Sequence, residues 1–70
     1  MYKLEKSLTI NVFNLLYLNP DAINGRLIGY INKLDNGYYE AVYLKTCFKD
    51  ICESKIEAKK FIINQFEMRD

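Results

Sequence analysis

The sequence predicts an α+β domain: a small three- to four-stranded antiparallel sheet packed against one carboxy-terminal helix. Three observations favour it. Apolar and polar residues alternate near the amino terminus, Asn36-Gly37 separates two extended apolar runs, and a helix-capping pattern begins at Ser54. Seventy residues of which half are hydrophobic are typical of a single ordered domain, here 1–70.

The first strand is expected over residues 2–13. Its apolar positions alternate with polar ones, as in a strand with one solvent-facing side: Tyr2, Leu4, Leu8, Ile10 and Val12. A helix over residues 8–18 is the alternative, because four residues fall on one helical stripe: Ser7, Asn11, Asn14 and Leu18. The β-branched side chains of Thr9, Ile10 and Val12 favour the strand.

Residues 19–25 are predicted to form a connection. Proline fixes φ and lacks a donor, and the flanking Asn19 and Asp21 can close turns with their side chains. Asn24-Gly25 adds a second place where the backbone can adopt a positive φ.

Residues 26–46 are predicted to form a hairpin that reverses at Asn36-Gly37, a pair suited to a two-residue type I′ turn. This turn would place Lys33 opposite Glu40 and Tyr30 opposite Tyr43. One face would then be aliphatic: Leu27, Ile31, Val42 and Leu44. The other would be largely aromatic: Ile28, Tyr30, Leu34, Tyr39, Ala41 and Tyr43. A three-residue loop with a glycine bulge would shift the pairing and regroup both sets.

A short strand is expected over residues 47–52, followed by a helix over 55–68. Ser54 and Glu57 have the spacing of a capping box, in which each side chain satisfies a backbone amide of the other. Five helix residues share one arc and are expected to pack on the sheet: Ala58, Phe61, Ile62, Gln65 and Phe66.

The tyrosine face is the main candidate for partner binding. Tyr30, Tyr39 and Tyr43, with the nearby Lys33 and Lys45, would form an aromatic patch of the kind that supplies binding energy at interfaces. The alternative is structural, because tyrosine also packs well in a core and the amino-terminal segment could cover this face. Basic residues on or near the sheet could contact phosphates or could simply be solvated: Arg26, Lys33, Lys45 and Lys49.

Composition argues against catalysis and cofactors. The chain has no histidine, so the usual general base and most nucleophilic triads are missing. Cys47 and Cys52 are interpreted as ordinary reduced thiols, and no metal or cofactor site is predicted. The apolar run over residues 8–18 is too short to span a bilayer. The expectation is a cytoplasmic protein that is not an enzyme and has no membrane partner.

Three stretches together resemble a known domain pattern: Gly29-Tyr30, Gly37-Tyr38-Tyr39-Glu40-Ala41-Val42-Tyr43 and Ser54-Lys55-Ile56-Glu57-Ala58. The pattern is similar to the three-strand-plus-helix DNA-binding domains of plant ethylene-response proteins, and to the arm-binding domains of some phage tyrosine recombinases. The resemblance covers residues 29–62 and implies a sheet-on-helix layout. Those families read DNA with arginines on the first two strands, whereas this chain has other residues there: Ile31, Asn32, Lys33 and Glu40.

The function expected from these features is non-enzymatic binding of a protein or nucleoprotein complex, which the chain would inhibit or regulate by steric contact. In style the chain is also similar to small phage anti-defence proteins, so an anti-CRISPR-like inhibitor encoded by a phage or mobile element is the most specific expectation. The alternative is a small DNA-binding regulator that uses the hairpin face, with direct nucleic-acid contact. The net charge of +1 gives no obvious nucleic-acid footprint. A homodimer would suit a chain this small, since it buries more apolar surface.

Overall fold

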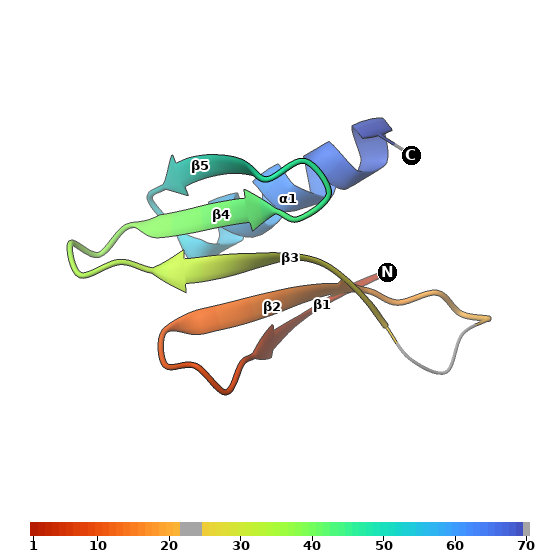
Figure 1. Cartoon of the computed structure of the whole chain (residues 1–70), viewed down its shortest axis with the longest axis horizontal. Helices are drawn as coiled ribbons and strands as arrows, with labels where there is room; N and C mark the ends of the chain where they lie inside the picture. Colours follow the sequence, from red (N-terminus) through yellow and green to blue (C-terminus); the bar gives the residue numbers. More distant parts are fainter. Residues whose placement is uncertain (22–24, 70) are drawn as a thin grey trace.

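The computed structural model describes residues 1–21 and 25–69 of the chain. Within them, five strands form one antiparallel sheet in the order β1-β2-β3-β4-β5, and a helix lies across one face (Figure 1). The elements are β1 Tyr2–Lys6, β2 Val12–Tyr17, β3 Arg26–Lys33, β4 Tyr39–Tyr43, β5 Phe48–Cys52 and α1 Lys55–Arg69. The predicted α+β class is confirmed, but the sheet has five strands rather than three or four.

The additional strand comes from the amino-terminal segment, where one strand was expected over residues 2–13. The chain reverses within this segment, so β1 and β2 pair as a hairpin and the helix considered for residues 8–18 does not form. The Thr9 N–H donates to Ser7 Oγ at 3.0 Å, and the Val12 N–H donates to the Thr9 carbonyl at 3.3 Å. Asn11 adopts a φ of 63°, a left-handed conformation that asparagine tolerates better than most residues.

The β3–β4 hairpin forms as predicted, but its register differs by one residue. The Leu34 N–H donates to the Tyr38 carbonyl at 2.8 Å, and the Gly37 N–H donates to the Leu34 carbonyl at 3.1 Å. Gly37 has a φ of 88° whereas Asn36 does not adopt a positive φ, which excludes a type I′ turn. The connection is therefore the three-residue loop with a glycine bulge, and Lys33 faces Tyr39 instead of Glu40.

This shift of one residue changes which side chains share a face. Ile31 pairs with Ala41 and Gly29 pairs with Tyr43, so Tyr39 and Tyr43 lie on the face that packs against α1. Tyr30 pairs with Val42 and lies on the opposite face. The expected division into an aliphatic face and a tyrosine face is therefore wrong.

The core lies between the sheet and α1. Its buried members come from four strands and the helix: Leu15, Ile28, Ile31, Ala41, Tyr43, Cys52, Ala58, Ile62 and Phe66. Ile28 is buried because β3 carries one extra residue where Leu15 pairs with Gly29 but Leu16 pairs with Leu27. The helix arc predicted to pack on the sheet is confirmed for its buried members, Ala58, Ile62 and Phe66.

Gly29 allows the helix to approach the sheet closely. A Cβ at this position would lie 2.5 Å from the Val42 carbonyl oxygen and 2.7 Å from Ile62 Cγ2, closer than real Cβ atoms come to such neighbours. Any side chain here would separate α1 from β3 or distort the pairing with β4. Glycine is therefore required by the packing of two layers.

The start of the helix follows the predicted cap in part. Ser54 Oγ accepts a hydrogen bond from the Glu57 N–H at 3.1 Å, which satisfies one amide of the first turn. The Glu57 carboxylate accepts from the N–H of Glu53 at 3.3 Å, instead of from that of Ser54. The serine half of the capping box is thus confirmed. The glutamate accepts from the backbone amide one residue before the predicted one.

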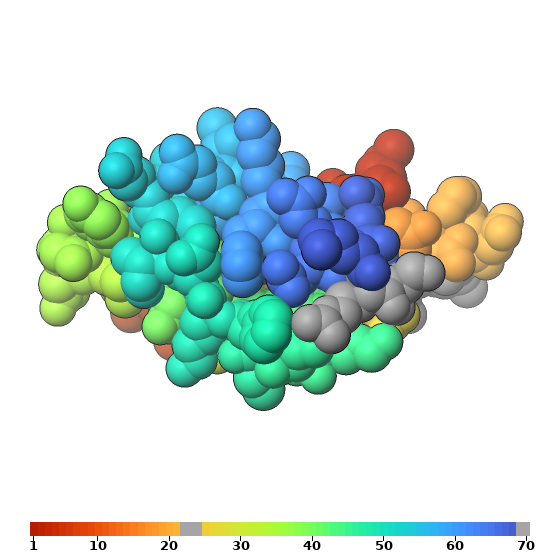
Figure 2. Space-filling model, turned by 90° about the horizontal axis from the view of Figure 1, so that it is seen from above, coloured from red at the N-terminus to blue at the C-terminus, as the bar shows by residue number. Residues whose placement is uncertain are grey.

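The other end of the helix packs over the first hairpin. The ring of Phe66 lies 5.1 Å from that of Tyr17 and 6.2 Å from that of Tyr2, between ring centroids. Figure 2 shows α1 in blue across the middle of the molecule, with the β3–β4 turn at one end and residues near 20 at the other. The aromatic cluster anchors β1 and β2 to the same core as β3 and β4.

The connection predicted for residues 19–25 is described only in part, because residues 22–24 lie outside the described chain. The Asp21 N–H donates to Asn19 Oδ1 at 3.0 Å, as expected of an Asx-turn. The predicted positive-φ site at Asn24-Gly25 lies partly outside the described residues. Within the described ranges, no helix is both long and apolar enough to cross a bilayer.

Candidate partner-contact surfaces

The three candidate tyrosines do not form one surface. Tyr43 is only 2% exposed and belongs to the core, and Tyr39 packs against the core from the helix side. Tyr30 is half-buried on the opposite face, between Asn14 of β2 and Val42 of β4. A partner that contacts Tyr30 on the sheet could therefore not contact Tyr43 at the same time.

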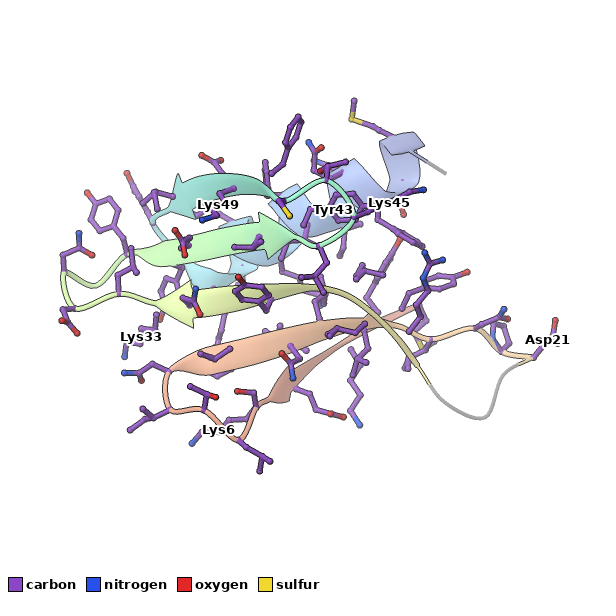
Figure 3. The ribbon with its side chains drawn as sticks, viewed as in Figure 1. Lys6, Asp21, Lys33, Tyr43, Lys45 and Lys49 are labelled. Carbon is purple, nitrogen blue, oxygen red and sulfur yellow. The ribbon has the colours of Figure 1, made fainter. Side chains whose placement is uncertain are left out.

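The candidate basic residues are also separated. Lys33 ends β3 on the helix side, whereas Lys49 pairs with Val42 on the opposite face. Lys45 lies in the β4–β5 turn, and the guanidinium of Arg26 lies 5.8 Å from the centre of the Phe66 ring. Figure 3 shows Lys33 and Lys45 toward opposite ends of the β3–β4 hairpin. These four cations do not line a common groove.

The sheet face opposite α1, here called the open face, is uncovered by any described element (Figure 1). One row of paired residues crosses all five strands: Glu5, Asn14, Tyr30, Val42 and Lys49. A second row runs beside it: Val12, Asn32, Glu40 and Ile51. The amide of Asn32 donates to Glu40 Oε1 at 3.0 Å, and Lys3 Nζ lies 3.3 Å from Glu5 Oε2. This face mixes apolar side chains with equal numbers of positive and negative charges.

Among the described residues, the β1–β2 loop (residues 7–11) carries the most exposed leucine and isoleucine side chains. Leu8 is 109% exposed and Ile10 is 81% exposed, relative to the extended reference. Sequence reasoning missed this surface because both residues continue the alternating pattern of β1. The available signal was the spacing of Ser7, Thr9 and Asn11, three residue types that form turns.

Lysines gather around the base of the β1–β2 loop. Lys6 pairs with Phe13 across the hairpin, and Lys55 Nζ lies 4.3 Å from the centre of the Phe13 ring. The backbone N–H of Lys33 donates to the Asn11 carbonyl at 2.7 Å, which places β3 directly beside the loop. The loop therefore combines two exposed aliphatic side chains with a positively charged base.

A shallow hollow of about 280 Å³ lies at the other end of the sheet. It is lined by Arg26, Leu27, Ile28, Tyr43, Leu44, Lys45 and Phe66. Its volume is just below the usual range of small-molecule sites, roughly 300–1,000 Å³. Its wide opening and mixed lining favour a surface depression over an enclosed ligand site.

The two cysteines are free, with Cys47 exposed and Cys52 buried. Burial raises the pKa of the Cys52 thiol, and the nearby carboxylates of Asp50 and Glu57 raise it further. A thiol with a raised pKa is a weak nucleophile at neutral pH, because little of it is thiolate. Among the described residues, no three Cys, Asp or Glu side chains gather as a metal site requires.

No protein-family model matches this chain, and no curated protein or solved structure matches it significantly. The resemblance over residues 29–62 therefore stays a prediction, and the function has to be argued from the surfaces described above.

Proposed function

We propose that this chain is a non-enzymatic binding protein that inserts its β1–β2 loop into an apolar pocket of a partner protein and regulates that partner by steric contact. The observation that carries the proposal is the exposure of Leu8 and Ile10 on a loop held by its own hydrogen bonds. The narrower expectation of an anti-CRISPR-like phage inhibitor stays a prediction.

The fold does not require Leu8 and Ile10 to be apolar. The loop conformation rests on the Ser7 hydroxyl, the Thr9 backbone and the left-handed Asn11. The two aliphatic side chains are exposed, so their apolar surface contributes little to the packing of the chain itself. Full burial of each against a partner would contribute about 1.5–3 kcal/mol. Because the loop is already ordered, little conformational entropy would oppose binding.

The charges favour a partner with a carboxylate-rich rim around its pocket. Lys6 and Lys33 are exposed near the base of the loop, and Lys55 lies over Phe13 nearby. Opposite charges around an apolar anchor speed association and fix orientation. DNA is a weaker fit, because an aliphatic tip gains little from phosphates and the basic residues are spread over both faces.

Site-specific photo-crosslinking in cells tests this proposal. A photoreactive residue replaces Thr9 at the loop tip or, as a matched control, Lys60 on the exposed side of α1. The Thr9 position is expected to crosslink one protein at defined stoichiometry, and the Lys60 position is not. The adduct should disappear in the Leu8→Ser, Ile10→Ser variant and weaken in the Lys6→Glu, Lys33→Glu variant.

The Ile56→Ser variant provides the control for lost surface hydrophobicity, since Ile56 is 67% exposed but lies on the helix. It should crosslink as the unmodified chain does. Equal adducts from Thr9 and Lys60, or an adduct that survives removal of both aliphatic side chains, would contradict the proposal.

A further inference from the structure

The row of residues that crosses the open face has opposite charges at its ends and Tyr30 at its centre. Glu5 lies on β1 at one edge and Lys49 lies on β5 at the other, each two strands from Tyr30. We propose that a second copy of this chain packs on the open face, so that two sheets form a sandwich with a two-fold axis along β3. This inference is independent of the proposed function, because it uses a different surface.

The two-fold axis follows from the order of the strands. A rotation by 180° about an axis that runs along β3 in the interface exchanges β1 with β5 and β2 with β4 of the second copy. It therefore sets Glu5 against Lys49 of the partner copy and Lys49 against Glu5 of the partner copy. The same residues serve on both sides, as an isologous interface requires. Tyr30 then meets its own equivalent on the axis.

The exposed apolar side chains of the open face also favour a second copy of the chain as the partner of this face. Leu27 and Ile51 are 45% and 51% exposed although they lie on a sheet, where each could be covered by another layer. Val42 on the same face is already only 2% exposed, so the additional burial would come from Leu27 and Ile51. Two sheets that pack face to face bury such side chains in a layer about 10 Å thick.

The size of the face predicts a weak dimer. Five strands spaced about 4.8 Å apart, with about five residues each, cover roughly 24 by 17 Å. That footprint is about 400 Å² per copy, or about 800 Å² in total, which is below the roughly 1,000 Å² of a stable interface and corresponds to a weak, transient one. We therefore expect dissociation in the micromolar range. The β1–β2 loop projects from the end of the strands, so the sandwich leaves it exposed (Figure 1).

Charge reversal and charge exchange test the geometry. Sedimentation equilibrium of the full chain should show a monomer–dimer equilibrium. Lys49→Glu and Glu5→Lys should each weaken the dimer roughly tenfold, because each creates two like-charge contacts. The double variant Glu5→Lys, Lys49→Glu should restore the dimer to within about threefold, since the exchanged charges again attract. Lys60→Glu makes the same charge change on α1 and should have no effect.

A second measurement does not depend on charge. In a Cys47→Ser background, Tyr30→Cys should be crosslinked to a covalent dimer by a bismaleimide that spans about 10 Å. Lys60→Cys in the same background should not. Circular dichroism and thermal unfolding establish that each variant is folded. A monomer at every concentration would overturn the inference, as would a dimer that tolerates both single reversals or fails to crosslink at position 30.

Discussion

The Tyr2 hydroxyl donates a 2.8 Å hydrogen bond to Glu67 Oε2, which joins the first strand to the last turn of α1. The two residues are 65 positions apart in the chain. Burial raises the pKa of Tyr2 to about 12, and the Glu67 carboxylate contributes through the hydrogen bond and through its charge. This contact, with the tilted rings of Tyr17 and Phe66 beside it, closes the β1 side of the core.

Tyr2→Phe should lower the free energy of unfolding by about 1 kcal/mol, because it removes one hydrogen bond to a charged acceptor and keeps the ring. Urea unfolding at neutral pH measures the loss. Glu67→Gln should cost less, because its side-chain oxygen can still accept from the hydroxyl. A Tyr2→Phe variant as stable as the unmodified chain would show that the contact contributes nothing.

The same hydrogen bond predicts a pH dependence at alkaline pH. The folded pKa of Tyr2 is about 12 and the unfolded value is near 10, so folding favours the protonated phenol. Its contribution is complete below about pH 10 and is lost as the pH rises through about 12. The stability difference between the unmodified chain and Tyr2→Phe should therefore shrink between about pH 10 and pH 12. A constant difference would contradict the raised pKa.

Gly29→Ala should destabilise the fold by about 2 kcal/mol or more, because the new methyl group would overlap the Val42 carbonyl oxygen and Ile62 Cγ2. Gly37→Ala provides the comparison. Nothing lies within 4 Å of a Cβ there, so only the strain of a φ of 88° remains, about 1 kcal/mol. Thermal unfolding should rank the two variants in that order, and the reverse order would show that helix and sheet are not closely packed at Gly29.

Tyr43→Ala and Tyr30→Ala test the hairpin register. Tyr43 is 2% exposed, so its truncation should cost about 3 kcal/mol or more, as for other large core residues. Tyr30 is half-buried on the open face, and its loss should cost about 1 kcal/mol or less. Denaturant unfolding separates these values. Equal losses would be expected only if both rings occupied the same face, as the two-residue turn required.

Ser54→Ala should cost about 1 kcal/mol, because the Glu57 amide loses its acceptor in the first turn of α1. Ser54→Asp should retain most of the stability, since a carboxylate can accept the same bond and suits a helix amino terminus. Amide hydrogen exchange of the first turn provides a local readout. Unchanged protection in Ser54→Ala would mean that another group satisfies these amides.

The helix and the position of the second hairpin were predictable from the sequence, because each depends on local chemistry. Ser54 and Glu57 identify the helix start, and the loop that ends at Gly37 marks the reversal between β3 and β4. The register was not predictable, because Asn36-Gly37 is compatible with a turn of two residues or of three. The choice rests on packing: the three-residue loop brings Tyr43 to α1 and leaves Gly29 where Ile62 needs space.

The first hairpin was missed for a different physical reason. Leu8 and Ile10 continue the apolar alternation of β1 through a reversal that contains neither glycine nor proline. The candidate surface therefore looked like the middle of a strand. The signal of the reversal is the spacing of Ser7, Thr9 and Asn11, which form the local hydrogen bonds and the left-handed conformation of the loop.

The sheet order follows the chain order without a crossover, and this affects how the protein forms during synthesis. Each strand can add to the one before it as soon as it leaves the ribosome, so early hairpins need not wait for distant segments. Ile62 and Phe66, which cover the shared apolar side, emerge after all five strands. A nascent sheet therefore exposes that side until translation reaches α1, which then covers the apolar side of the five strands made before it.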